Sequence, residues 1–426
     1  MTNCELLSNK SELLVLPNLL NMHNHCIAAT PFRGMSEDMP LETADEFPAE
    51  LVYGLLLPMI DTLVETLDRD ETSALFRPGL LEVIKGGTTT LTEVFRMAHE
   101  QLIELAIDMG LRLNAMVYLF SAQGFSVDEN GVPQFEGRGD DQSMLDQWVD
   151  FHDRYDNAAE SRVVVGASPH GTNTCSPELL SALHLLTEER KAPVTIHLSQ
   201  TQSEEDLAQQ RYGMSATRYL DSTGLLGPSM LAAHCLFLSD DDLALMKERG
   251  ASVVNCPLTF ARGGVFAPYH RFKDAGLRTV LGTDGYCMDI VGEMRAAGFI
   301  SKLHGASPGK SSAWELVQAA TSDSADFLNR PDLGRIRPGA AADLIAIDMN
   351  KAHFQPVSDP IKTFFWNGSR ADIDIVMVDG QVLVNDGHYK LGDEETILRE
   401  GAAAAQKAWQ AVKKAGSIKS HYLEGI

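Results

Sequence analysis

The chain is poor in cysteine, and none of its six cysteines forms a Cys-x-x-Cys pair. This spacing excludes a zinc knuckle, and six scattered thiols in 426 residues do not form the dense disulfide framework of a secreted domain. The first twenty residues lack the basic start of a signal peptide, and no apolar run matches the length of a membrane span. We therefore expect reduced thiols, no contact with a membrane and a cytoplasmic location.

Positive charge is also scarce, with 35 Lys and Arg residues against 59 Asp and Glu residues and a formal net charge of -24. A field of this sign repels phosphate, which argues against nucleic acid as a partner. The sequence contains no Gly-x-Ser-x-Gly elbow and no phosphate-binding loop, so hydrolysis at phosphate has no support. A small-molecule substrate fits this composition best.

What the chain does contain is an alternation of short β-branched runs and longer amphipathic stretches, which is typical of repeated βα units. Helix starts are readable, for example Ser176 before Pro177, and Ser239 with Asp242 as a capping box. The pattern predicts a TIM-type (β/α)8 barrel. The eight expected strands are 19–22, 88–93, 112–118, 162–167, 194–197, 230–234, 252–255 and 279–282.

The predicted barrel spans residues 17–330, after an N-terminal segment, 1–16, that could join a β appendage. Short strands separated by turns predict a small C-terminal β appendage over 331–392, followed by a helix and tail over 393–426. Residues 121–141 are rich in glycine and acids, and we expect a long irregular insertion there, either a mobile lid or a solvated loop.

Polar residues with metal-binding side chains follow several expected strands. His23 and His25 lie two apart, so on a strand both face one side and can hold one ion. Alone, this pair fits equally well a strand that ends in solvent. His197, His234 and Asp284 end other strands, however, and strand ends converge at one mouth of a barrel. The five side chains predict a hydrolase that activates water with a divalent ion.

An ordered set of motifs resembles the amidohydrolase superfamily, specifically its branch of aminohydrolases acting on cytosine, guanine, adenosine-type and triazine rings. The resemblance covers most of the chain, and its motifs occur in the family's order. Relatives have several tens of residues before the first barrel strand, so we expect the β-sandwich appendage here to be reduced. The matching segments are 17–25, 33–34, 87–90, 168–170, 233–234, 282–285, 338–339 and 342–344.

The resemblance implies that His23, His25, His197 and Asp284 ligate one divalent metal ion, with zinc as the default and iron or manganese also suited. No lysine occupies 162–167, so the carboxylated lysine of two-metal members is absent. The implied reaction is deamination, in which metal-bound hydroxide attacks a ring carbon of a nitrogen heterocycle and displaces an exocyclic amino group.

Further roles also follow from the resemblance. Asp284 would accept a proton from the attacking water, His234 would orient that water or polarise the target, and His170 would contact the substrate. Barrels of this family commonly pair, so we expect a homodimer.

The sequence departs from the family at Gln200, where related deaminases have a glutamate. An amide can hold a ring nitrogen but cannot shuttle a proton. One explanation is a leaving group that departs as an anion, as in hydrolytic desulfurisation or dechlorination of a thiohydantoin or triazine. Another is that His234 or His170 takes over. A third is a metal-containing binding protein without catalysis.

Two arginines are candidates for a substrate carboxylate. Arg262 lies beside two glycines in a segment that differs from the relatives, and Arg96 follows the second expected strand. Either guanidinium could form a fork for a carboxylate, and either could be an ordinary loop arginine.

Overall fold

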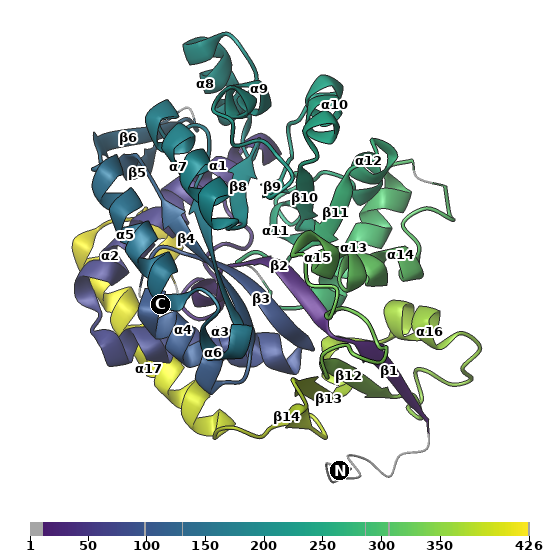
Figure 1. Ribbon diagram of the computed structural model, residues 1–426. Coiled ribbons are helices and arrows are strands. Elements are labelled where there is room, and N and C mark those ends of the chain that lie inside the picture. Colours follow the sequence, from purple (N-terminus) through teal and green to yellow (C-terminus); the bar gives the residue numbers. More distant parts are fainter. Residues whose placement is uncertain (1–11, 98, 130, 286, 306, 425–426) are drawn as a thin grey trace.

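Eight parallel strands form the central barrel (Figure 1). The computed structural model describes residues 12–97, 99–129, 131–285, 287–305 and 307–424. Neighbouring strands follow one another along the chain, and an isolated parallel bridge between Asn24 and Asp284 joins the first strand to the region after the last. The predicted TIM-type barrel is confirmed. Its strands are β2 (Leu19–Asn24), β3 (Thr88–Phe95), β4 (Arg112–Leu119), β7 (Val163–Pro169), β8 (Val194–Leu198), β9 (Met230–His234), β10 (Ser252–Asn255) and β11 (Arg278–Leu281).

Helices surround the barrel and begin at the caps that the sequence predicts. The Ser176 side chain accepts a hydrogen bond from the Leu179 amide, and Ser239 forms a reciprocal capping box with Asp242. Because helices cover the strands, every residue of β2 and β3 is buried. The helices are α3 (Arg69–Lys85), α4 (His99–Asp108), α5 (Asp141–Tyr155), α6 (Ala158–Ser161), α7 (Pro177–Arg190), α8 (Gln202–Tyr212), α9 (Ala216–Ser222), α10 (Asp240–Arg249), α11 (Pro257–Ala261), α12 (Tyr269–Asp274), α13 (Ile290–Leu303), α14 (Ala313–Ala319) and α15 (Ser322–Phe327).

The connection from β2 to β3 is unusually long and mostly helical. Its run Ala44–Thr66 is long and apolar enough to cross a membrane by length and composition, so the prediction that no segment reaches this length is wrong. Within the fold, 72% of its most apolar window is buried, as in the core helix of a globular domain. The elements of this connection are η1 (Cys26–Ala29), η2 (Ala44–Glu46), α1 (Phe47–Ala49), the π-helix η3 (Glu50–Leu56) and α2 (Leu57–Thr66).

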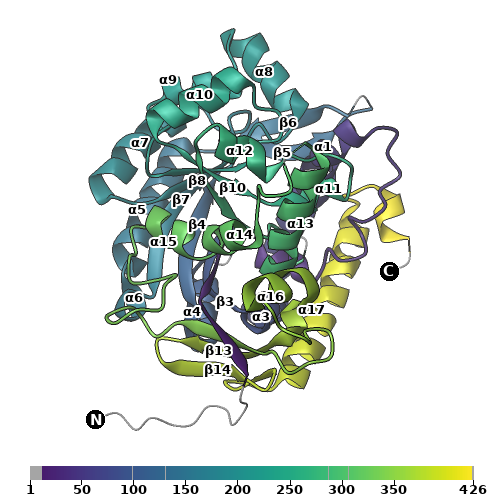
Figure 2. The same cartoon turned by 90° about the vertical axis from the view of Figure 1, so that its right-hand side faces the viewer.

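The C-terminal appendage is a five-stranded antiparallel sheet that includes the start of the described chain. Strand β1 (Leu13–Pro17) pairs with β12 (Leu344–Asp348) from Leu13 opposite Asp348 to Pro17 opposite Leu344. The last long helix, α17 (Glu394–Ala415), packs along α3 and α2 on the barrel's flank (Figure 2). The remaining elements are β13 (Ile373–Val378), β14 (Gln381–Asn385), β15 (His388–Tyr389), α16 (Pro360–Asn367), η4 (Arg370–Asp372) and η5 (Ser420–Leu423).

The segment 121–141, expected to be irregular, contains a β-hairpin of β5 (Ala122–Val127) and β6 (Pro133–Arg138), so that prediction is wrong. Phe125 lies opposite Phe135 across the hairpin, and both rings pack near Tyr53 of η3. Such an aromatic cross-strand pair stabilises strand pairing despite the surrounding glycines. The hairpin therefore packs on the helical connection between β2 and β3.

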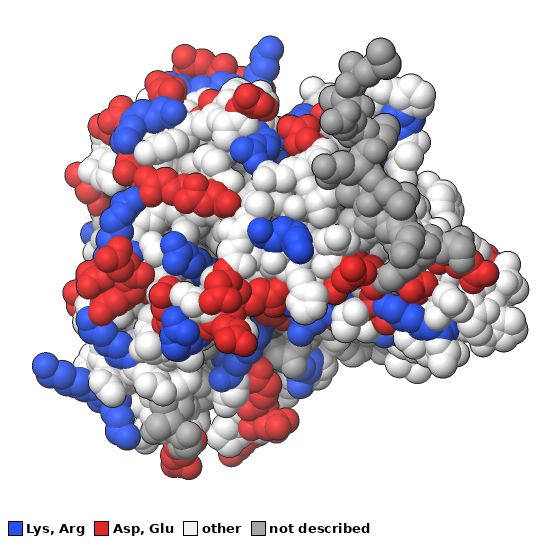
Figure 3. Space-filling view, turned by 90° about the horizontal axis from the view of Figure 1, so that it is seen from below, with Lys and Arg blue, Asp and Glu red and all other residues white. Residues whose placement is uncertain are grey.

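The outer surface mixes charges of both signs. On the face seen from below, Lys and Arg side chains lie among Asp and Glu side chains (Figure 3). Among the residues coloured there, no broad basic area of the kind that binds nucleic acid is seen.

A buried ion pair joins the appendage to the barrel. The guanidinium of Arg112, on β4, donates from Nε to Asp343 Oδ2 at 2.7 Å and from a terminal nitrogen to Oδ1 at 3.0 Å. The Asp343 side chain is fully buried and also accepts a hydrogen bond from the Asp379 amide at 2.7 Å. One carboxylate thus holds β4 and the turn between β13 and β14 together.

Removal of this carboxylate by Asp343→Ala should lower the free energy of unfolding by about 3 kcal/mol, the low end for breaking a buried ion pair, because the buried Arg112 guanidinium keeps the half-exposed Asp379 at 3.2 Å as a second partner. The control Asp326→Ala removes an exposed partner of Arg335 and should cost only about 0–1 kcal/mol. Denaturant unfolding of both variants measures the difference. Equal losses would contradict the structural role given to Asp343.

Candidate active site

Four histidines and one aspartate meet at the C-terminal ends of the barrel strands. His23 lies on β2 and His25 just beyond it, while His197 lies on β8, His234 ends β9 and Asp284 follows β11. The Asp284 Oδ1 atom is 3.4 Å from His25 Nε2 and 3.8 Å from His23 Nε2. Its Oδ2 atom is 3.7 Å from His234 Nε2. The strand ends thus bring together the predicted metal ligands and His234.

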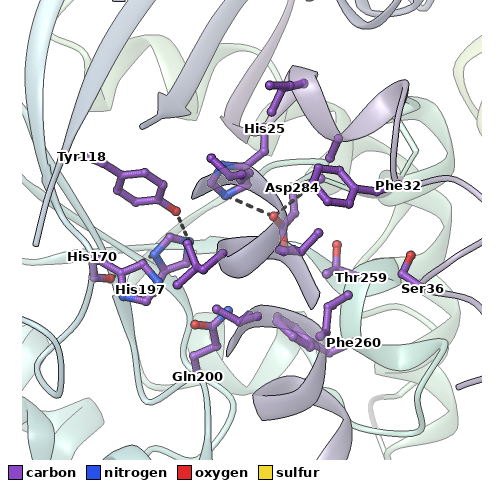
Figure 4. A pocket seen from close by; sticks show the side chains of 18 of the residues that line it. His25, Phe32, Ser36, Tyr118, His170, His197, Gln200, Thr259, Phe260 and Asp284 are labelled. Atoms are coloured by element: carbon purple, nitrogen blue, oxygen red, sulfur yellow. Dashed lines mark hydrogen bonds and ion pairs between the residues drawn. The ribbon is translucent and has the colours of Figure 1, made fainter. Parts of the chain in front are cut away.

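Hydrogen-bond partners at Nδ1 fix the orientation of the His25 and His197 rings. His25 Nδ1 lies 2.7 Å from the Val94 carbonyl oxygen, and His197 Nδ1 lies 3.0 Å from the His170 carbonyl oxygen. Because each Nδ1 faces a backbone acceptor, each Nε2 is directed to the centre of the cluster. Figure 4 shows His25, His197 and Asp284 around one pocket, with the Tyr118 hydroxyl 3.4 Å from His197 Nε2.

The chemistry of the cluster fits one divalent metal ion. Neither ring nitrogen of the fully buried His23 has a hydrogen-bond partner among the residues that the structure describes, and the same holds for His234. Buried polar atoms are costly when unpaired, and a metal would satisfy them. Burial, followed by the neighbouring histidines, lowers the pKa of His23 well below its usual value, and burial lowers the pKa of His234 to about 3. Neutral imidazole is the form that ligates metal.

Strained backbone marks the same strand ends. Ser199, His234, Cys235 and Asp284 have φ angles of 49°, 70°, 54° and 55°, a region that residues other than glycine seldom adopt. The surrounding structure must hold these conformations in place, and such strain concentrates at functional sites. Here it turns the chain immediately after three barrel strands, and two of the strained residues belong to the cluster.

The predicted substrate contacts separate into two groups. His170 and Gln200 are buried and line the same pocket as His25 and Asp284 (Figure 4). Arg262 also lines this pocket. Arg96 does not belong to the described lining; one of its terminal nitrogens lies 2.8 Å from Asp61 Oδ1.

Sequence reasoning missed a polar network that joins β2 to the segment after β11. The Thr283 hydroxyl accepts hydrogen bonds from the Asn21 and Asn24 side-chain amides at 2.7 and 2.6 Å, and the Thr283 amide donates to Asn21 Oδ1 at 3.0 Å. Asparagines inside an apolar strand were the available signal, since buried polar side chains need partners. This network sets His23 and Asp284 beside each other.

Buried carboxylates outside the predicted set were also missed. Glu93 accepts a hydrogen bond from the Cys26 amide, and burial raises its pKa well above the usual value. Glu204 accepts hydrogen bonds from the Thr172 hydroxyl and from the backbone N–H of Gln200, and burial raises its pKa to about 7. These carboxylates hold the backbone of loops at the site.

Curated relatives with similar sequences are named as deaminases. A 5-methylthioadenosine/S-adenosylhomocysteine deaminase from Dictyoglomus thermophilum is 30% identical over 408 residues, which are 94% of this chain and 88% of that protein. A 5′-deoxyadenosine deaminase from Methanosarcina mazei is 29% identical over 400 residues, with 92% and 86% of the two chains covered.

Solved structures share the fold. A zinc-bound adenosine deaminase from Xanthomonas campestris has a TM-score of 0.80 at 19% identity, with 93% of this chain and 86% of that chain covered. A zinc complex of atrazine chlorohydrolase from Arthrobacter aurescens TC1 has a TM-score of 0.81 at 23% identity, with 92% and 88% covered. The Amidohydrolase family matches residues 14–383, which is most of the chain. As its motifs predict, the chain belongs to the amidohydrolase family.

Proposed function

We propose that the protein is a metal-dependent deaminase that hydrolyses an exocyclic amino group from a nitrogen heterocycle. The observation that carries this proposal is the convergence of His23, His25, His197, His234 and Asp284 in one buried cluster beside a pocket. Relatives over almost the whole chain are named as deaminases, which supports the C–N hydrolase class over a binding protein without catalysis.

The cluster and the family support a divalent metal ion, and we assign it to His23, His25, His197 and Asp284. Zinc is the ion we propose, because the donor set of imidazole and carboxylate suits it and two solved structures of this fold contain it. A divalent ion in such a site lowers the pKa of a coordinated water and so provides hydroxide near neutral pH.

We assign the proton transfers of the reaction to Asp284 and His234. The Asp284 carboxylate faces both His25 and His234, so it can accept a proton from the attacking water and pass it toward the substrate. His234 is fully buried and neutral, which suits it to orient that water by a hydrogen bond. Both groups act from fixed positions at strand ends.

On the substrate side, His170 and Gln200 would hold the ring. The His170 ring is fixed by a 2.9 Å contact between its Nδ1 and the Thr174 hydroxyl, and it stacks on Phe120 with ring centroids 4.6 Å apart. The side-chain amide of Gln200 can donate a hydrogen bond to one ring atom and accept one from another. These contacts would present the ring carbon to the Asp284 side of the pocket.

A second candidate activity is hydrolytic desulfurisation or dechlorination of a heterocycle such as a thiohydantoin or a triazine. The observation that favours it is the amide of Gln200 in the pocket lining, where related deaminases have a carboxyl group. Sulfide and chloride depart as anions and need no proton from the enzyme, so an amide at this position would not impair their release.

Compartment and assembly are further proposals. The cysteines of the described residues are unpaired, which supports our proposal of a reducing compartment such as the cytoplasm. A homodimer stays a prediction from family resemblance, and sedimentation velocity would test it.

The metal assignment predicts that His197→Ala lowers metal affinity by at least ~100-fold, since even residues that only orient a ligand contribute 10–100-fold. Two quantities should fall together in this variant: the metal content that remains after dialysis, and the turnover rate. His388→Ala, an exposed histidine on β15, is the matched control and should keep both. Full metal content in the His197 variant would remove this residue from the ligand set.

The leaving group can be identified directly by incubating the metal-loaded protein with amino-, thio- and chloro-substituted pyrimidines, purines, triazines and hydantoins. We expect release of ammonia, because the deaminase reaction accounts for the family and the cluster together. Sulfide or chloride without ammonia would instead select the second candidate activity. Release of none of the three would contradict both.

The buried Glu204 predicts a pH-dependent stability. Burial raises its pKa from 4.5 to about 7, so the folded protein holds this proton more tightly than the unfolded chain does. The resulting stabilisation is full below about pH 4.5 and is lost as the pH rises to about 7. The glutamine in Glu204→Gln cannot ionise, so the variant does not lose this stabilisation. The difference in free energy of unfolding, variant minus wild type, should therefore rise between about pH 4.5 and pH 7 and then level off.

Denaturant unfolding at several pH values measures this difference. Glu189→Gln, which changes an exposed glutamate on α7, should follow the wild type throughout. A Glu204→Gln profile parallel to the wild type would show that Glu204 does not titrate in this window.

A further inference from the structure

The pocket has a polar end and an apolar wall. Tyr118 and His170 lie on one side, near His25 and His197, and Phe32 and Phe260 lie on the other (Figure 4). The lining includes nine apolar side chains, and of these Val52 and Leu57 pack in one cluster with Phe120, beside Tyr118. The apolar set is Ile27, Ala28, Phe32, Leu51, Val52, Leu56, Leu57, Ile60 and Phe260.

Five members of this wall come from the π-helix η3 and helix α2. A π-helix of seven residues is rare, and π-helical turns are frequent at functional sites. Leu51, Val52 and Leu56 of this π-helix line the pocket. The wall is therefore built mainly by the long connection between β2 and β3, with Phe260 contributed by α11.

The outer side of the wall is held by the C-terminal segment. Glu50 is the first residue of η3 and is buried, and its carboxylate accepts hydrogen bonds from Lys419 Nζ at 2.8 Å and from the Tyr422 hydroxyl at 2.7 Å. The Thr62 hydroxyl of α2 donates to Ser417 Oγ at 2.8 Å. These contacts fix η3 and α2 to the segment that follows α17, so the wall is held from its outer side.

The arginine in this lining already has partners. Arg262 donates to the Ser36 hydroxyl at 2.8 Å and to the Thr259 carbonyl at 2.9 Å, and it lies 3.5 Å from Glu37. Its charge is thus offset by a carboxylate of the protein itself. A substrate carboxylate here would lose its hydration against apolar side chains and compete with Glu37.

Resting on the proposed deaminase reaction, we propose that the wall from Leu51 to Ile60 is a subsite for an uncharged, apolar arm of the substrate. The heterocycle lies at the polar end with its leaving group near Asp284, and an alkyl or alkylthio arm lies against η3 and α2. Acidic arms are rejected. Each methylene buried there contributes about fourfold in binding, from about 0.8 kcal/mol per methylene.

The experiment compares substrates that share one amino-substituted core and differ at the end of one arm: hydroxyl, hydrogen, methylthio or carboxylate. The core is the one that binds best in a calorimetric screen. We expect kcat/KM to rise from the hydroxyl to the methylthio arm by tenfold or more and to fall at least tenfold for the carboxylate. A flat or reversed order would overturn the subsite.

Binding of the same series, with the amino group replaced by hydrogen, is measured by calorimetry in parallel. If the hydrogen-substituted series binds in the expected order but the amino-substituted series is not turned over, the subsite is supported and the proposed deaminase activity is contradicted. If the amino-substituted series is turned over but binding does not follow the expected order, the deaminase activity is supported and the subsite is contradicted. A series in which no arm improves binding would overturn the subsite.

Leu56→Asn provides a test within the chain, because asparagine has a similar shape but a polar end. The ratio of kcat/KM between the methylthio and hydroxyl arms should fall about tenfold. Leu185→Asn, which changes an exposed leucine on α7, should keep the wild-type ratio. Should Leu56→Asn fail to fold, Val52→Thr makes a milder change in the same wall, with an expected fall of about threefold. An unchanged ratio in a folded wall variant would contradict the proposal.

Discussion

The contact that closes the barrel also brings together two of the proposed metal ligands. The Asp284 amide donates to the His23 carbonyl at 2.9 Å, and the Thr283 hydroxyl accepts from Asn21 and Asn24. These bonds join the first barrel strand to the segment after the last. Because His23 and Asp284 lie within this junction, the barrel cannot close without bringing an imidazole and a carboxylate together. Fold and site therefore depend on one network of polar side chains.

The parts of the structure that sequence could predict are those set by local pattern. Strands such as β10 and β11 appear as β-branched runs, and the barrel rule then places His197 and Asp284 at one mouth. The hairpin of β5 and β6 and the π-helix η3 depend on partners distant in sequence. Phe135 packs on Tyr53, and Glu50 is held by Tyr422, and neither contact has a periodic signature. Those missed elements form or support the apolar wall.

Gln200 stands where related deaminases have a glutamate, and neither Glu204 nor Glu93 belongs to the described pocket lining to replace that carboxylate. Glu204 is close in sequence, but its oxygens accept hydrogen bonds from the backbone N–H groups of Gln200 and Thr172, so the carboxylate holds the loop in place. Glu93 binds the Cys26 amide in the same manner. The carboxylate in the described pocket lining is Asp284, so the lining offers this carboxylate, the histidines and the Tyr118 hydroxyl for proton movement in either candidate reaction.

Charge acts on the substrate at two distances, and both effects favour a neutral molecule. Far from the surface, the net charge of -24 lowers the local concentration of anions, although salt screens this effect beyond about 10 Å. Inside the pocket, screening is weak and the Arg262 charge is already matched by Glu37. An acidic arm is thus repelled on approach, and among the described lining residues the Arg262 charge that it would meet is already offset by Glu37. An apolar arm avoids both penalties and, under the proposed subsite, gains from the wall. Burial has the same effect on the histidines, because it lowers the pKa of His23 and His234 and so favours their neutral forms.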